Sequence, residues 1–81
     1  MQIDVLFFAS YRELAGAERR SVTLPEGASA GDLVARLRSL DESLARLPDT
    51  AAVVVNHHVV RPDHSIAPSD EVALLPPVAG G

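Results

Sequence analysis

Residues 1–8 read MQIDVLFF, and the pattern of this stretch decides how the rest of the chain is interpreted. The apolar residues of one face occupy every second position: Ile3, Val5 and Phe7. A period of two predicts a β-strand with one buried face. The opposite face begins polar and turns apolar at Leu6 and Phe8, and this second apolar patch needs a partner of its own.

A short helix and a second strand are expected directly after this strand. In residues 10–16, SYRELAG, Ser10 is expected as the helix N-cap and Glu13 is in capping-box position. Gly16 can adopt the left-handed conformation that ends a helix. Residues 18–24, ERRSVTL, then alternate apolar and polar side chains and run into a Pro-Glu-Gly turn. They are interpreted as the second strand.

The main helix is expected between Ser29 and Pro48. Ser29 and Asp32 repeat the capping-box spacing, which marks the helix start. The apolar residues that share one helical face are Leu33, Val34, Leu37, Leu40 and Leu44. This spacing predicts one amphipathic helix that ends before Pro48.

The last third of the chain returns to strand patterns. The expected elements are a strand at residues 51–55, a tight turn at Asn56 and His57, a short strand at residues 58–61, a loop over residues 62–70 and a final strand at residues 71–75. Asn and His tolerate the positive φ that a two-residue hairpin turn requires. Pro76 and Pro77 end the final strand because neither can donate to a ladder.

This order of elements predicts an α+β protein of the β-grasp type, with a mixed four- to five-stranded sheet packed on one main helix. In that topology the first and last strands are central neighbours. We expect two parts: a β-grasp domain over residues 1–76 and a flexible Gly-Gly tail over residues 77–81.

Composition narrows the possible functions. A chain of 81 residues forms one small domain, and its net charge of −4 with arginines spread along the chain argues against nucleic-acid binding. No apolar run reaches the roughly 18 residues of a membrane span. The absence of cysteine excludes disulfides, thiolate catalysis and a cysteine-ligated metal. We expect a cytoplasmic protein that contacts neither membrane nor nucleic acid.

Polar residues offer no self-contained active site. Adjacent residues of an extended segment point to opposite faces, so His57 and His58 do not easily share one ion, and with His64 they predict no metal site. Asp70 and Glu71 could be paired carboxylates for acid–base chemistry, but a turn that feeds the final strand is favoured. No catalytic triad order or glycine-rich phosphate loop is present.

The chain ends in residues 74–81, LLPPVAGG, an apolar and uncharged stretch. Pro76 and Pro77 stiffen its base, whereas Gly80 and Gly81 make its tip narrow. The six residues after Leu75 span at most about 20 Å when extended, so the terminal carboxylate could thread a channel of another protein.

A bare carboxylate is a poor electrophile, so carrying a group on it requires activation, most simply as an acyl-adenylate made by a partner. With no thiol in the chain, the terminal carbonyl is the only plausible site for a sulfur cargo. The chain also lacks lysine, which leaves an activated terminus almost no amine of its own to acylate.

Four stretches together resemble a known family: VLFFASYRELAG (5–16), LPEGAS and DLVARL (24–29 and 32–37), VVVN (53–56) and DEVALLPPVAGG (70–81). They are similar to the small subunits of molybdopterin synthase, which are ubiquitin-like sulfur carriers. The resemblance covers nearly the whole chain, and its most specific part is the Pro-Pro-Val-X-Gly-Gly ending.

The resemblance implies that Gly81 is adenylated by an E1-like enzyme using ATP and magnesium, and is then thiocarboxylated with sulfur from a donor such as a cysteine desulfurase or rhodanese. The tail residues that enter the large subunit are Pro77, Val78, Ala79 and Gly80. There Gly81 passes its sulfur to cyclic pyranopterin monophosphate (precursor Z), forming the dithiolene of molybdopterin. The large subunit supplies the catalytic residues of the heterotetramer, and this chain is a non-catalytic subunit that binds no cofactor itself.

The resemblance also places a partner interface on Phe8, Val59 and Leu75, with Arg12 as a polar contact. A structural alternative for Phe8 is that it closes the edge of the core. Ser69 stands where the family often has glycine. This departure leaves open a carrier for another acceptor, in thiamine thiazole or cysteine synthesis. A ubiquitin-like protein modifier is an alternative of a different class.

Overall fold

The structure is a computed structural model that describes residues 1–77. Its elements, in chain order, are β1 (Gln2–Phe7), α1 (Ser10–Ala15), β2 (Arg19–Thr23), α2 (Ala30–Arg38), the 3₁₀ helix η1 (Leu44–Arg46), β3 (Ala52–Val55), β4 (His58–Val60) and β5 (Val72–Leu75). The expected tail residues 78–81 lie outside the described part. Within residues 1–77, no helix has the length and apolar character needed to cross a bilayer.

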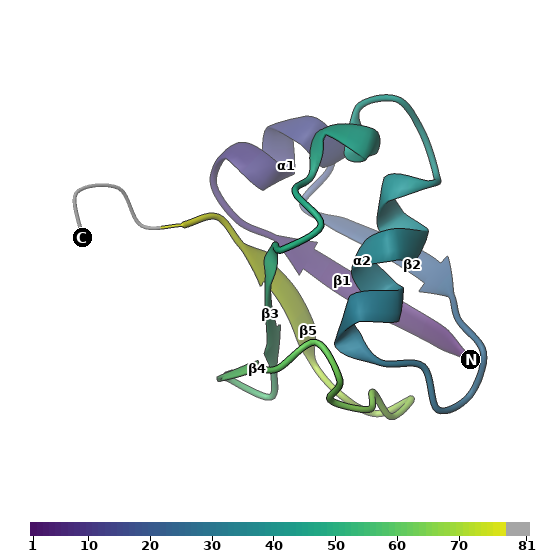
Figure 1. Ribbon diagram of the computed structural model, residues 1–81. Coiled ribbons are helices and arrows are strands. Elements are labelled where there is room, and N and C mark those ends of the chain that lie inside the picture. The colour runs from purple at the N-terminus through teal and green to yellow at the C-terminus, as the bar shows by residue number, and fades with distance from the viewer. Residues whose placement is uncertain (78–81) are drawn as a thin grey trace.

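The strands form one five-stranded sheet in the order β2-β1-β5-β3-β4. β1 and β5 run parallel, and every other neighbouring pair is antiparallel. The first and last strands are therefore central neighbours, as predicted, and the sheet is mixed. The chain leaves β5 on the side of the molecule opposite the N-terminus (Figure 1).

The core lies between one face of this sheet and α2, which crosses it in Figure 1. Ile3, Val5 and Phe7 of β1 are 1%, 0% and 0% exposed, which confirms the face predicted from residues 1–8. From α2, Leu33 and Leu37 are both fully buried against them. The helix and the sheet thus bury one face of each other, whereas within residues 1–77 no helix covers the other face of the sheet (Figure 1).

The predicted start of α2 is confirmed, but its predicted end is wrong. Ser29 accepts a hydrogen bond from the backbone N–H of Asp32, whose side chain accepts one from Ser29 in return. The helix ends at Arg38, because Ser39 Oγ donates to the Arg36 carbonyl at 2.7 Å and competes with further turns. Leu44 belongs to η1 instead, although it is buried as expected.

The predicted capping box of α1 is also wrong, whereas its predicted stop is confirmed. Neither Ser10 nor any other side chain caps the helix, because the chain enters α1 through a tight turn at Ala9. Tyr11 N–H donates to the Phe8 carbonyl across that turn at 3.1 Å. Ser10 is therefore already helical. Gly16 ends α1 in the left-handed conformation at φ 69°.

The hairpin between β3 and β4 follows the prediction. Asn56 and His57 have φ of 51° and 72°, the positive values that a two-residue turn demands. Val55 pairs with His58 across the turn.

Candidate functional site

One row of side chains crosses the whole sheet on the face that α2 leaves open. Residues directly opposite each other on neighbouring strands share a face, so the strand register defines this row. Its members, from β2 to β4, are Arg19, Leu6, Ala73, Val54 and Val59. Four of these five side chains are apolar, which continues on the neighbouring strands the apolar face predicted at Leu6.

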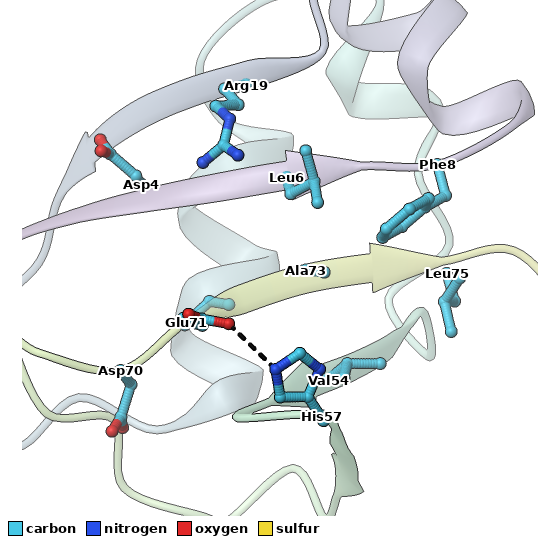
Figure 2. A pocket seen from close by; sticks show the side chains of 11 residues that line it. Asp4, Leu6, Phe8, Arg19, Val54, His57, Asp70, Glu71, Ala73 and Leu75 are labelled. Atoms are coloured by element: carbon cyan, nitrogen blue, oxygen red, sulfur yellow. Dashed lines mark ion pairs between the residues drawn. The ribbon is translucent and has the colours of Figure 1, made fainter.

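A hollow of about 570 Å³ lies on this open face. Ala73 of β5 carries only a methyl group, whereas its neighbours Leu6 of β1 and Val54 of β3 rise on either side of it. The floor of the hollow is therefore low in the middle of the sheet. Figure 2 shows Phe8 and Leu75 at the end of the hollow from which the chain leaves β5.

Phe8, Val59 and Leu75 are the exposed large hydrophobic residues among residues 1–77, with 36%, 69% and 37% of their surfaces accessible. They are the three side chains that the sequence assigned to a partner interface. Phe8 lies outside the buried core cluster. Exposed apolar side chains gathered on one face are typical of protein-binding surfaces.

The backbone that positions Phe8 is unusual. Ala9 has φ 51° and ψ −128°, a conformation that glycine adopts easily and alanine only with strain. The turn is held on both sides, since Phe8 N–H donates to Leu74 O and Arg12 N–H donates to Ala9 O at 3.0 Å. The strained residue thus directs Phe8 onto the open face and the chain into α1.

The opposite end of the hollow is charged. Asp4, Asp70 and Glu71 lie at that end, whereas Arg19 and His57 line the hollow nearer its middle (Figure 2). His57 Nε2 lies 3.2 Å from Glu71 Oε2, and both side chains are mostly exposed. Along β1 and β5 the open face therefore changes from apolar near Phe8 to acidic near Asp4.

Hydrogen bonds fasten the β3–β4 turn to the start of β5, and we call this set, made by Asn56, Ala67, Asp70 and Glu71, the Asn56 clamp. Asn56 Nδ2 donates to Asp70 Oδ1, and the Glu71 N–H donates to Asn56 Oδ1, both at 3.0 Å. The Ala67 N–H donates to Asp70 Oδ2 at 2.8 Å. The Ala67 and Asn56 donors lower the pKa of Asp70. The turn interpretation of Asp70 is confirmed, and Asp70 remains ionised to a lower pH than usual.

The remaining predicted site residues are Arg12 and those of the tail. Arg12 is exposed on α1 and does not line it. Pro77 is the last described residue, and Val78, Ala79, Gly80 and Gly81 lie outside the described part. Within residues 1–77, no three His, Cys, Asp or Glu side chains form a group that could hold a metal ion.

Sequence reasoning missed the hollow and the Asn56 clamp. The signal for the clamp was present in the Asn56 and Asp70 side chains, but they are 14 positions apart and nothing local links them. The signal for the hollow was Ala73, a small residue in a strand of larger ones. Its significance depends on which side chains flank it across strands.

A mixed sheet wrapped around one helix, with an exposed apolar face beside the strand that leads to the C-terminus, defines a ubiquitin-like β-grasp protein. The model of the ThiS family matches residues 5–81, and the chain belongs to this family.

Individual relatives agree with this assignment. A molybdopterin synthase sulfur carrier subunit of Chlamydomonas reinhardtii is 37% identical over 83 residues, covering 100% of both chains. The crystal structure of SAMP1 from Haloferax volcanii superposes with a TM-score of 0.83 at 28% identity, again over 100% of both chains. A chain of the complex of subunits 1 and 2 of molybdopterin-converting factor from Helicobacter pylori gives a TM-score of 0.70 at 26% identity, covering 100% of both chains.

Proposed function

We propose that this protein is the sulfur carrier subunit of molybdopterin synthase. The observation that carries the proposal is the 37% identity, over the full length of both chains, with a relative of that name. The Gly-Gly ending agrees with it, because this ending presents a carboxylate on a stretch without bulky side chains. The protein then acts as a carrier, and its partners supply the catalytic side chains.

The reactive atom is the carbonyl carbon of Gly81. Its carboxylate attacks the α-phosphate of ATP on an E1-like enzyme, releasing pyrophosphate and leaving an acyl-adenylate. A sulfur nucleophile from a donor, such as a persulfide of a cysteine desulfurase or rhodanese, then displaces AMP. A second thiol of the donor or activating partner then attacks the cysteine sulfur of this acyl disulfide, which releases the Gly81 thiocarboxylate and leaves a disulfide on the partner. The magnesium belongs with the ATP of the activating partner.

Delivery follows in the large subunit of the synthase. Residues 77–80 lead Gly81 into that subunit, where its thiocarboxylate sulfur attacks cyclic pyranopterin monophosphate. Water then hydrolyses the resulting thioester, so that the sulfur stays on the pterin and Gly81 returns to a carboxylate. Two deliveries form the dithiolene. Phe8, Val59 and Leu75 serve as the docking contact, with Arg12 at its margin, and two carriers flank a large-subunit dimer. The similar Helicobacter pylori chain, which comes from a complex of subunits 1 and 2 of molybdopterin-converting factor, supports a partner of this kind.

Intact-mass spectrometry tests the proposal. We expect co-expression with a matching activating enzyme and sulfur donor to add the mass of one sulfur-for-oxygen exchange, located at Gly81. A variant that lacks Gly81 keeps its fold and gains no mass. A terminus that stays a plain carboxylate under these conditions contradicts the proposal.

A second candidate is a protein modifier, which the likeness to SAMP1 favours, since related chains are described as small archaeal modifier proteins. In this case the activated Gly81 acylates lysines of other proteins. Conjugates that survive denaturation and contain Gly81 in an isopeptide bond support the modifier, and their absence beside a thiocarboxylate supports the sulfur carrier. A different sulfur acceptor, in thiamine thiazole or cysteine synthesis, would appear as a different protein in a pull-down.

A further inference from the structure

The hollow over Ala73 extends beyond the three side chains of the proposed docking contact. Resting on the function proposed above, we propose that this hollow takes one large apolar side chain of the synthase large subunit, beside a lysine or arginine of that subunit that faces Asp4. Ala73 and Asp4 then determine how tightly the two subunits bind. Phe8 and Leu75 line the hollow, so the proposed pocket is continuous with the docking contact.

The shape of the hollow suits an anchoring side chain. Its volume of about 570 Å³ has room for a large apolar side chain together with the cationic side chain beside it, and its floor is the methyl group of Ala73 between Leu6 and Val54. Interfaces concentrate their binding energy where a large side chain fills such a central pocket. Ala73 is 9% exposed, because its small side chain lies below those of its neighbours.

The negative charge at the end of the hollow near Asp4 favours a lysine or arginine of the large subunit. Three carboxylates and one arginine line the hollow, which leaves an excess of negative charge. Asp70 is engaged by the Asn56 clamp, and Glu71 pairs with His57. Within residues 1–77, Asp4 makes no side-chain hydrogen bond or ion pair, and Arg19 makes no ion pair. Asp4 is therefore the carboxylate left for a cation of the partner.

Two other occupants fit less well. A second copy of this chain also has a net charge of −4 and would place its own carboxylates against this end. The side chains of residues 78–81 are all uncharged, so they offer no cation to face Asp4 and Glu71. A cationic and apolar segment of another protein is complementary to both ends of the hollow.

The first test fills the hollow. Ala73→Leu places a larger side chain on its floor, and the matched control Ala35→Leu makes the same change on the exposed side of α2. Calorimetry with the purified large subunit should show binding weakened by at least about tenfold for Ala73→Leu and unchanged for the control. Equal affinities for wild type and Ala73→Leu, with both folded, overturn the proposal.

The second test removes the charge. We expect Asp4→Asn to weaken binding by about threefold to tenfold at low salt and to flatten its dependence on salt concentration. Glu42→Gln is the matched control, because it also removes one negative charge, at an exposed position beyond the end of α2. An unchanged affinity and salt dependence in Asp4→Asn would show that no cation of the partner faces Asp4.

Methyl NMR of the wild-type protein keeps the proposal testable if Ala73→Leu does not fold. Adding the large subunit should shift the Ala73 and Val54 methyl signals, and unshifted signals in a formed complex overturn the proposal. Shifts that depend on the concentration of this chain alone would assign the hollow to a second copy. Shifts on removal of residues 78–81 would assign it to the tail. If wild type does not bind the large subunit at all, the proposed function fails together with this inference.

Discussion

The two faces of the sheet are both rich in apolar side chains, yet only one of them is used to fold the protein. On the covered face, Phe7 and Leu74 have no exposed surface, because both belong to the buried core cluster. On the open face, their sequence neighbours Phe8 and Leu75 remain 36% and 37% exposed. Residues adjacent in sequence, at the ends of β1 and β5, thus separate the two tasks, since successive side chains of an extended chain point to opposite faces. Substitutions on the covered face should affect stability, and those on the open face should affect binding.

The sharpest test of this division is Leu37→Ala on the covered face. Leu37 of α2 is fully buried in the core, so its truncation leaves a cavity. We expect the free energy of unfolding to fall by about 2–5 kcal/mol, as for buried leucines in general. Urea denaturation followed by circular dichroism measures it. If the free energy of unfolding falls no more than it does for a truncation on the open face, the two faces do not differ in their contribution to stability.

A smaller effect of opposite sign is expected from Tyr11→Phe. Tyr11 is 5% exposed, its hydroxyl has no hydrogen-bond partner within residues 1–77, and burial raises its pKa. Removing an unsatisfied buried hydroxyl should raise the unfolding free energy by about 1 kcal/mol. Thermal denaturation detects the change. The control, Phe8→Tyr, adds a hydroxyl on the open face, where water can reach it, and should leave the melting temperature nearly unchanged.

The stability of the protein at acid pH should depend on the carboxyl groups of Asp70 and Asp41. Backbone N–H donors of Ala67 and Leu44 lower the pKa of Asp70 and Asp41, with further help from Asn56 and Arg20 respectively. A lowered folded-state pKa means that the unfolded state binds more protons, so stability is lost as the pH falls below about 4.

We therefore expect Asp70→Asn to be less stable than wild type at neutral pH, with the difference shrinking as the pH falls. Asp41→Asn should behave likewise. Chemical denaturation at a series of pH values measures both variants. A stability difference for Asp70→Asn that grows toward low pH would contradict the Asn56 clamp as described.

The smallest effect on stability is expected for Val59→Ala on the open face. Val59 is 69% exposed, so truncation should change the unfolding free energy by no more than about 0.5 kcal/mol. Binding to the large subunit should nevertheless weaken by up to about tenfold, since the two methyl groups that the substitution removes no longer contribute apolar contact with that subunit. Calorimetry of binding and urea denaturation, applied to the same samples, separate the two. Unchanged binding would remove Val59 from the docking contact.

Local signals in the sequence predicted the elements well where the structure depends on local contacts alone. The capping boxes at Ser29 and Ser10 have the same spacing, yet only the first forms. The difference lies in Ala9, whose positive φ starts α1 one residue earlier than a serine cap would. The four-residue spacing from Leu40 to Leu44 resembles a continuing helix. In the structure it spans a turn in which Asp41 accepts a hydrogen bond from the Leu44 N–H at 2.8 Å.

The open face could be predicted only in part. The exposed positions of Phe8, Val59 and Leu75 agree with the sequence assignment, which came from family resemblance and from the alternation in residues 1–8. The hollow depends on the parallel pairing that sets Leu6 beside Ala73, positions 67 residues apart. No local pattern encodes a volume produced by such a pairing.

The parallel pairing of β1 and β5 also has a mechanical consequence. β1 starts near the N-terminus and β5 leads out toward the C-terminus, so tension applied between Met1 and Pro77 acts along both strands in opposite directions. Such a force loads the hydrogen bonds between the two strands together in shear, and cannot peel them apart one at a time. A machine that pulls on the end of this chain therefore meets its greatest resistance at the first step, before any of the sheet has opened.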